Sequence, residues 1–135
     1  MVFTLIVGVL ASMAAMNMTG QMSQHRLSGA TRYMTWDLMS ARMKAIKLRQ
    51  NVQIAFVDTQ TYTIWIDINQ NGTPDSGETE SKNLHDQYPG VHLTSTDAIH
   101  FNSRGAPSNP VTITLSNSTT NKIIKIDVSG FINSI

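Results

Sequence analysis

The chain has 135 residues, with 10 lysines and arginines against 9 aspartates and glutamates, which gives a formal net charge of +1. This length suits a single small domain, and the absence of cysteine excludes a disulfide framework and a thiolate metal site. The basic groups are concentrated in residues 1–50 and the acidic groups in residues 51–135. Few aromatic residues are interleaved with the basic ones. We therefore favour cations near a helix C-terminus over a nucleic-acid or anionic-lipid patch.

Residues 1–50 predict one continuous helix. Residues 1–16 contain no charged side chain, and the first signals that end a helix are Gln50 and Asn51. A helix of about 50 residues is about 75 Å long, which is far more than a chain of this size needs. The apolar tip must therefore lie in a bilayer or among copies of itself. The residues expected in such a filament core are Val2, Leu5, Ile6, Val9, Leu10, Met13 and Met16.

The second half of this helix carries two apolar stripes at helical spacing. The first stripe comprises Leu27, Ala30, Met34, Leu38, Ala41, Ala45 and Leu48, and the second comprises Tyr33, Trp36, Met39, Met43 and Ile46. A helix that is apolar on two neighbouring sides has more apolar surface than one sheet covers. We expect one face to cover a β-sheet and the other to meet neighbouring subunits.

Residues 51–135 predict an antiparallel β-domain. Apolar and polar residues alternate over 52–57, 62–68, 111–116 and 124–128, and turn signals separate these runs. Such alternation is typical of strands with one buried face. The expected fold class is α+β: a long N-terminal helix with an apolar tip and an amphipathic second half, packed on a C-terminal antiparallel sheet. The expected domains are residues 1–50 and residues 51–135.

The segment between the second and third of these strand runs, residues 67–78, has the spacing of a calcium loop of the EF-hand type. Oxygen-bearing side chains occupy the first, third, fifth, ninth and twelfth places, and Gly72 occupies the sixth. The expected ligands are Asp67, Asn69, Asn71, Thr73 through its backbone carbonyl, Asp75 and Glu78 through both carboxylate oxygens. The alternative is a long hairpin loop in which Asn71-Gly72 supplies an ordinary turn.

Catalysis has little support in the sequence. The four histidines, His25, His85, His92 and His100, are scattered, and none has the helical two-histidine spacing of a zinc site. Nucleophile-elbow and phosphate-loop patterns are absent. We expect no catalytic residues, no nucleic-acid site, and no cofactor other than calcium.

Four segments carry a resemblance to a known family. Residues 1–14 (MVFTLIVGVLASMA) resemble the hydrophobic helix of type IV pilins and type II secretion pseudopilins. Residues 41–54 are similar to the helix-to-strand junction of GspH/FimT-type minor pilins, and residues 99–106 and 122–132 resemble that family's two carboxy-terminal strand motifs. The resemblance covers most of the chain in order and implies a pilin-like fold.

The apolar tip fits the pilin helix in two registers. In one, Phe3 begins the mature pilin and Val7 stands where the family has a near-invariant glutamate. In the other, Gly8 and Ala11 fall on the family's small positions, and about six further residues, the glutamate among them, precede the tip. We favour the second register, because it restores an apolar span of roughly 20 residues.

The resemblance implies a structural subunit of a type IV pilus-like or type II secretion pseudopilus filament. Its partners would be copies of itself, other pilins, the bacterial inner membrane before assembly, and prepilin peptidase acting on the precursor. The filament would then be periplasmic or extracellular. The alternative is a FimT-like minor pilin that binds DNA for uptake. Members of that kind bear an arginine-rich stretch near the C-terminus, where residues 130–135 here contain no basic group, so we expect DNA binding to be absent or weak.

Overall fold

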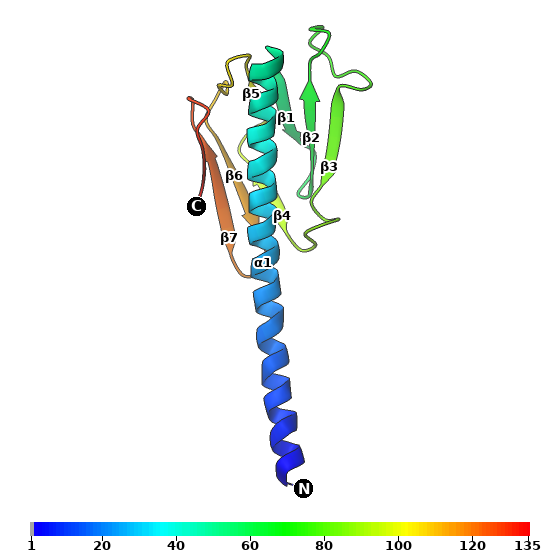
Figure 1. Ribbon diagram of the computed structural model, residues 1–135, viewed down its shortest axis with the longest axis vertical. Helices are drawn as coiled ribbons and strands as arrows, with labels where there is room; N and C mark the ends of the chain where they lie inside the picture. The colour runs from blue at the N-terminus through cyan, green and yellow to red at the C-terminus, as the bar shows by residue number, and fades with distance from the viewer. Residues whose placement is uncertain (1) are drawn as a thin grey trace.

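The N-terminal helix dominates the shape of the molecule. The computed structural model describes residues 19–135 in full and, for residues 2–18, the backbone alone. Helix α1 spans Val2–Leu48 without a break. Its C-terminal half lies against the β-domain, and its N-terminal half extends beyond it as a free rod (Figure 1). The continuous helix predicted from the sequence is confirmed.

Helix α1 ends in a left-handed turn. Arg49 has a φ of 54°, and the Gln50 N–H donates a hydrogen bond of 3.2 Å to the Ala45 carbonyl. This six-to-one bond is the signature of the Schellman motif. Glycine is the usual residue at the left-handed position, so Arg49 is an exception there.

Eight strands follow the helix. They are β1 Val52–Phe56, β2 Thr61–Ile66, β3 Thr79–Asn83, β4 His92–Ser95, β5 Ile99–Phe101, β6 Val111–Ser116, β7 Asn121–Ile126 and β8 Ile132–Ser134. They form two antiparallel four-stranded sheets, with the orders β3-β2-β1-β5 and β4-β6-β7-β8. The chain therefore crosses to the second sheet at β4, returns for β5, and crosses again at β6. The predicted α+β fold is confirmed, with two sheets in place of one.

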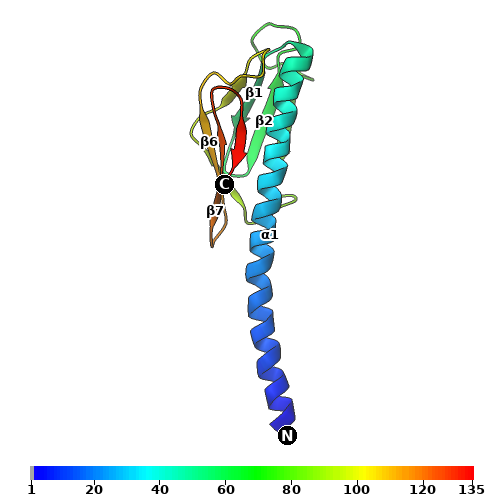
Figure 2. The ribbon, with the colours of Figure 1, turned by 60° about the vertical axis from the view of Figure 1, so that its left-hand side comes forward.

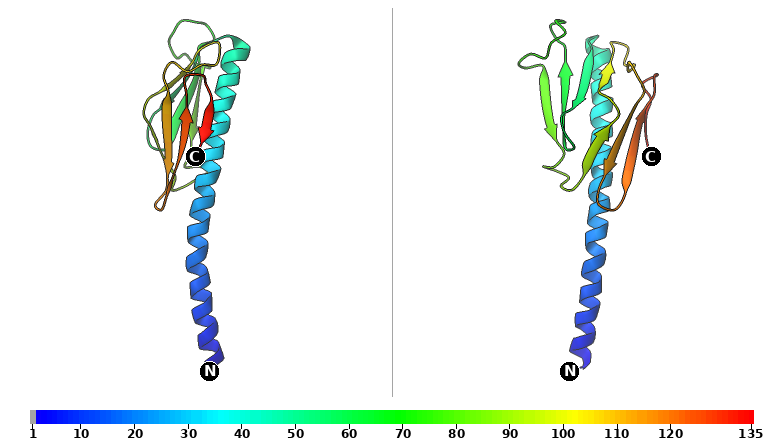
Figure 3. Two further views of the ribbon diagram at one scale, coloured as in Figure 1. Left: turned by 90° about the vertical axis from the view of Figure 1, so that its left-hand side faces the viewer. Right: turned by 180° about the vertical axis from the view of Figure 1, so that it is seen from behind.

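The helix covers both sheets from one side. Seen from behind, the sheets diverge to either side of α1 (Figure 3), and in side view α1 runs along one surface of the β-domain (Figure 2). The helix contacts β1 and β5 of the first sheet and β6, β7 and β8 of the second. The core therefore lies between the helix and the inner faces of both sheets.

The first of the two helical stripes forms the helix side of this core. Six of its residues are at most 1% exposed: Leu27, Ala30, Met34, Leu38, Ala41 and Ala45. Leu48, the seventh, is 47% exposed because it lies at the end of the helix. The sheets contribute alternate residues such as Ile54, Ile64, Ile113 and Ile124. Burying each large side chain contributes roughly 1.5–3 kcal/mol.

Three strand boundaries differ from the prediction. Val57, Ile68 and Val128 were expected to continue the alternating strands, but each lies just past a strand end and is more than half exposed.

Strands β3, β4 and β8 were not predicted. Strand β3 is polar and mostly exposed, so alternation could not reveal it. Helix α1 ends just before residue 50, and β1 begins just after it. The division into two domains at residue 50 stays a prediction.

A polar cluster fixes α1 on the first sheet. Asp37 is 4% exposed; its Oδ2 accepts a 2.5 Å hydrogen bond from the Tyr62 hydroxyl, and its Oδ1 pairs with Lys82 Nζ at 2.9 Å. Lys82 Nζ also lies 5.4 Å from the centre of the Tyr33 ring. This cluster joins the helix to β2 and to the polar strand β3. Each buried oxygen of the Asp37 carboxylate thus has a donor, as a buried charge requires.

The Tyr62→Phe substitution tests the cluster. It removes the donor to Asp37 Oδ2 while keeping the ring in the core, and an oxygen left unsatisfied there should cost about 1–3 kcal/mol of the free energy of unfolding. Urea denaturation of the chain in mild detergent, followed by circular dichroism, measures the change. Tyr88→Phe is the matched control, because the Tyr88 hydroxyl bonds no group within residues 19–135. Equal stability of the two variants would contradict the assigned role.

The same cluster predicts a loss of stability in alkali. Burial and, after it, the hydrogen bond to Asp37 raise the pKa of Tyr62. For Lys82, burial alone would lower the pKa, but the hydrogen bond and the negative charge of Asp37 act in the opposite direction, and the net effect raises the pKa. Both groups hold their protons more tightly in the folded chain. The contribution of these two groups to the free energy of unfolding should therefore be level below about pH 10 and fall above it. The fall should be smaller in a Tyr62→Phe, Lys82→Met double variant; identical pH profiles would refute the linkage.

Candidate assembly surface and loop site

The predicted filament core lies outside the residues whose side chains the structure describes. Its residues are Val2, Leu5, Ile6, Val9, Leu10, Met13 and Met16. The backbone there is helical and belongs to the protruding half of α1 (Figure 2). Within the part of the chain that is fully described, no helix has the length and apolar character needed to cross a membrane. The assignment of the tip to a filament core stays a prediction.

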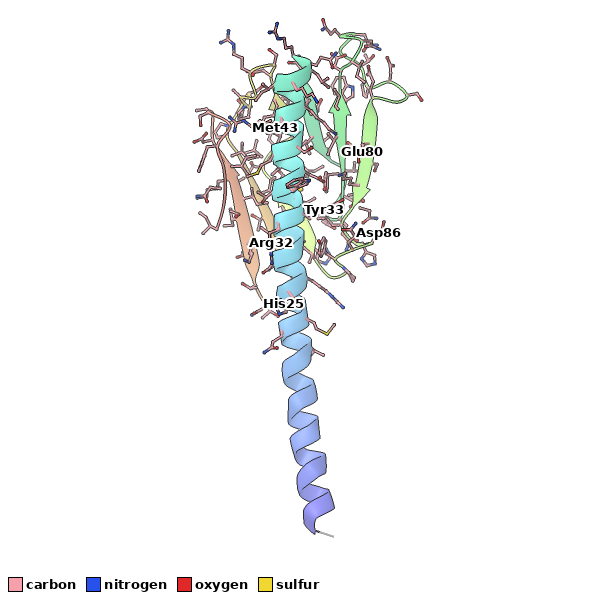
Figure 4. The ribbon with its side chains drawn as sticks, viewed as in Figure 1. His25, Arg32, Tyr33, Met43, Glu80 and Asp86 are labelled. Atoms are coloured by element: carbon pink, nitrogen blue, oxygen red, sulfur yellow. The ribbon has the colours of Figure 1, made fainter. Side chains whose placement is uncertain are left out.

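Most of the second helical stripe is an exposed apolar surface, whereas its first residue, Tyr33, is half-buried and packs against the core. Trp36 is 70% exposed, Met39 47% and Met43 63%, and Phe131, from the turn after β7, is 62% exposed. We call these four residues the outer face. Met39, Met43 and Phe131 line, with Arg42 and Ile132, a hollow of about 300 Å³; Trp36, Met39 and Met43 line, with Ser40, a second of about 250 Å³. The label of Met43 in Figure 4 locates this face on the upper part of α1.

A short turn holds Phe131 on the outer face. Asp127 Oδ1 accepts hydrogen bonds from the backbone N–H groups of Ser129 at 2.8 Å and Phe131 at 3.2 Å. The Ser129 hydroxyl bond is the main cause that lowers the pKa of Asp127. An aspartate that bonds the N–H two residues ahead makes an Asx turn. The Asp-Val-Ser-Gly sequence could have predicted this turn, but the strand was expected to run to Val128.

Arg42 fixes the neighbouring loop against the helix. Its Nε donates a 3.0 Å hydrogen bond to the Gly105 carbonyl. Gly105 has a φ of +75°, and a Cβ at that position would lie 2.6 Å from Ile46 Cδ1, so only glycine fits under the helix there. Arg42 was one of the basic groups that would serve a DNA-binding protein. In the structure it has a structural partner.

In the loop between β2 and β3, the Asp67 side chain points inward. The residue is 8% exposed. Its Oδ2 accepts a 3.2 Å hydrogen bond from the Gly72 N–H, and Gly72 adopts a φ of +73°. Asp67 Oδ1 is buried without a hydrogen-bond partner in the described part of the chain. Asp67 and Gly72 also line a cleft of about 420 Å³ beside β1, β2 and β5.

Three further predicted ligands converge on one another. The side-chain amides of Asn69 and Asn71 both donate to Asp75 Oδ2, at 2.8 and 2.6 Å. These two bonds lower the pKa of Asp75. Asn69 Oδ1 accepts the Asn71 N–H, and Asn71 Oδ1 accepts the Thr73 N–H. The predicted third, fifth and ninth positions of the loop therefore lie together.

Glu78 has a different place from the one predicted. It is 8% exposed, and its Oε1 accepts the N–H groups of Ile68 and Asn69 at 3.0 and 3.1 Å. Its Oε2 accepts Trp65 Nε1 at 3.3 Å and the Asp75 N–H at 3.4 Å. A carboxylate has about four lone-pair sites, and here four N–H donors use them. Glu78 thus closes the loop by itself instead of offering both oxygens to a cation.

No group of three or more histidine or carboxylate side chains among the fully described residues is arranged to hold a metal ion. The exposed histidines stay apart: His25 lies on the helix (Figure 4) and His100 on β5. Asp67, Asp75 and Glu78 accordingly do not form an all-carboxylate site. A cation in the loop would need the amide and backbone oxygens as well.

Comparisons with known proteins agree with this architecture. A family model described as type II transport protein GspH matches residues 30–130. The solved type IV minor pilin FimU of Pseudomonas aeruginosa is similar with a TM-score of 0.65 and 15% identity over 82% of this chain and 88% of that chain. The minor pseudopilin EpsH from the type 2 secretion system of Vibrio cholerae has a TM-score of 0.64 and 15% identity, over 82% and 96% of the two chains. No curated protein matches.

The two structural likenesses concern the fold, since their identities are low. Each of them covers 82% of this chain. The family match covers the packed half of α1 and all strands but the last. None of these comparisons supports the alternative of DNA capture.

Proposed function

The chain belongs to the family of the type II transport protein GspH, and we propose that it assembles with other pilins through two parts of α1. The family consists of structural subunits of pili or pseudopili rather than enzymes, and this chain is such a subunit. The apolar tip would pack in the filament core. The outer face would meet the neighbouring subunit.

The observation that carries the proposal is the unequal burial of α1. The stripe from Leu27 to Ala45 is covered by the chain's own sheets, whereas Trp36, Met39 and Met43 on the same stretch of helix remain exposed. Large aromatic and methionine side chains are enriched at protein interfaces. Exposed apolar residues grouped around a hollow mark an interaction surface.

The distribution of charge supports a neighbouring pilin as the occupant. Arg32 and Lys47 are exposed on the helix, and Glu80 and Asp86 are exposed on the β-domain; Figure 4 places Arg32 on α1 and the two acidic residues beyond β2. A basic helix surface on one copy and an acidic β-domain on the next are complementary. Such complementarity fixes the register of an interface more than it adds affinity.

The same proposal covers the location of the subunit. Before assembly the apolar tip would anchor it in the bacterial inner membrane, and prepilin peptidase would process the precursor. Assembly would then move the subunit into a periplasmic or extracellular filament. Family membership and the absence of charge in residues 1–16 support these steps.

Removing the tip should separate folding from assembly. A variant lacking residues 1–19 keeps the stripe from Leu27 to Ala45 and all eight strands, so it should remain folded but monomeric. Sedimentation velocity measures its mass, and circular dichroism measures its fold. Long polymers formed by the truncated variant would overturn the role of the tip.

A charge on the outer face should block assembly without unfolding the subunit. Because Trp36 is 70% exposed, Trp36→Glu should change the free energy of unfolding by no more than about 0.5 kcal/mol. Filament yield in electron micrographs should fall strongly, because burying an unpaired carboxylate in an interface is unfavourable. Val57→Glu is the matched control: Val57 is 64% exposed but lies after β1, away from the outer face. Normal filaments from Trp36→Glu, or equal loss in both variants, would refute the interface.

A further inference from the structure

The β2–β3 loop contains a buried carboxylate oxygen that its own chain does not use. Asp67 is 8% exposed, and its Oδ1 has no hydrogen-bond partner among the fully described residues. Its other oxygen is held by the Gly72 N–H, so the side chain cannot turn away without losing that bond. Buried charges in proteins are paired or coordinate metals. The Asp67 oxygen therefore points to a cation.

The neighbouring residues have the spacing that such a cation needs. Counting from Asp67, oxygen-bearing side chains stand at the third, fifth and ninth places, in Asn69, Asn71 and Asp75, and glycine stands at the sixth. The structure brings these three side chains together, because both asparagine amides bond Asp75 Oδ2. The hydrogen bond from the N–H of Gly72, at the sixth place, to the carboxylate of Asp67, at the first place, fixes the start of the loop. This arrangement matches the first nine places of the EF-hand calcium loop.

We propose that the β2–β3 loop binds a calcium ion through Asp67 Oδ1, the side-chain oxygens of Asn69 and Asn71, the Asp75 carboxylate and the Thr73 backbone carbonyl. Glu78 is the residue that positions this loop. The site is independent of the outer face and of filament assembly.

The hydrogen bonds now present leave these oxygens able to bind an ion. A carbonyl oxygen has two lone pairs, so Asn69 Oδ1 can keep the Asn71 N–H and still face a cation. Asn71 Oδ1 accepts both the N–H and the hydroxyl of Thr73, and the hydroxyl is free to rotate away. At Asp75 the ion would replace the two amide N–H donors. Each exchange substitutes a full positive charge for a weaker dipole.

The ligand chemistry selects calcium among common cations. All the proposed ligands are oxygens, which suits a hard cation, and residues 67–78 contain neither histidine nor cysteine for zinc. Magnesium demands near-ideal octahedral geometry and keeps its waters, whereas calcium accepts six to eight oxygens in flexible geometry. With only two carboxylates among the ligands, affinity should be modest. We expect a Kd of about 10⁻⁴ to 10⁻³ M, as in extracellular modules.

Glu78 and Trp65 provide a direct readout of the loop. Glu78 Oε2 accepts both Trp65 Nε1 and the N–H of the ligand residue Asp75. A change in the position of Asp75 on ion binding therefore alters the surroundings of the Trp65 indole. The chain has two tryptophans, so a Trp36→Phe background makes Trp65 the sole tryptophan, whose emission can be excited apart from that of the tyrosines.

The experiment is a calcium chloride titration of the full chain in mild detergent, in the Trp36→Phe background, followed by Trp65 emission and by calorimetry. Saturable binding in the range of about 10⁻⁴ to 10⁻³ M is expected. Asp67→Asn and Asp75→Asn should each weaken it at least about tenfold, because each removes one of two anionic ligands. Asp58→Asn is the matched control: it makes the same charge change in the β1–β2 turn, where Asp58 Oδ1 accepts the backbone N–H groups of Gln60 and Thr61. Glu78→Gln should shift Trp65 emission before calcium is added.

Three results would overturn the proposal: no saturable heat or emission change up to about ten times the expected Kd, equal binding by Asp67→Asn and Asp58→Asn, or an identical curve with magnesium chloride. If Asp67→Asn does not fold, Asp75→Asn carries the same test, because Asp75 is exposed. Circular dichroism of each variant without calcium shows whether a loss of binding comes from the missing ligand or from a variant that has not folded. Loss of calcium binding with normal filaments would leave the assembly proposal intact.

Discussion

The packing of one helical stripe against two sheets is the constraint on which the rest of the structure depends. Each sheet has four short strands, and the side of each sheet that points away from the helix faces water, so neither sheet could bury enough apolar surface alone. The stripe from Leu27 to Ala45 closes both at once. Three of its six residues are alanines, whose small side chains let the helix approach the strands closely. Because a helix can turn only one side to the sheets, the same packing commits the opposite side, with Trp36 and Met43, to solvent or to another subunit.

Apolar packing alone does not fix how the helix is placed along the sheets, since a stripe of similar side chains fits in more than one register. The Asp37 cluster removes this freedom. Its carboxylate is satisfied only when Tyr62 from β2 and Lys82 from β3 both reach it, and any slip of a helical turn would bury an unpaired charge. A buried polar group that selects one arrangement is well attested in helical packing. The cluster also explains why β3, with a polar sequence, stays paired at the edge of the sheet.

Periodicity predicted most of the fold and little of the polar detail. The helix, its two stripes and strands β1, β2, β6 and β7 follow from residues that alternate or recur at fixed spacing, and six of the seven residues of the first stripe are buried. Strand β3 could not be found in this way, because its stability comes from pairing with β2 and from Lys82. The calcium ligands were proposed from spacing alone, and the structure brings Asn69, Asn71 and Asp75 together. Glu78 accepts four N–H groups in the structure, and spacing alone cannot tell a metal ligand from a carboxylate bound in this way.

The β2–β3 loop is physically joined to the end of the helix. Gln50 Nε2 donates to the Ile68 carbonyl at 2.8 Å, and the Asp67 N–H donates to the Asn51 carbonyl at 3.3 Å. These bonds connect the first two residues of the proposed ion site to the segment where α1 gives way to β1. Order in the loop therefore stabilises the left-handed turn at Arg49, which ends the helix. The loop lies at the opposite end of α1 from the apolar tip (Figure 1), so an ion bound there would act on the β-domain while leaving the protruding rod free to enter a filament.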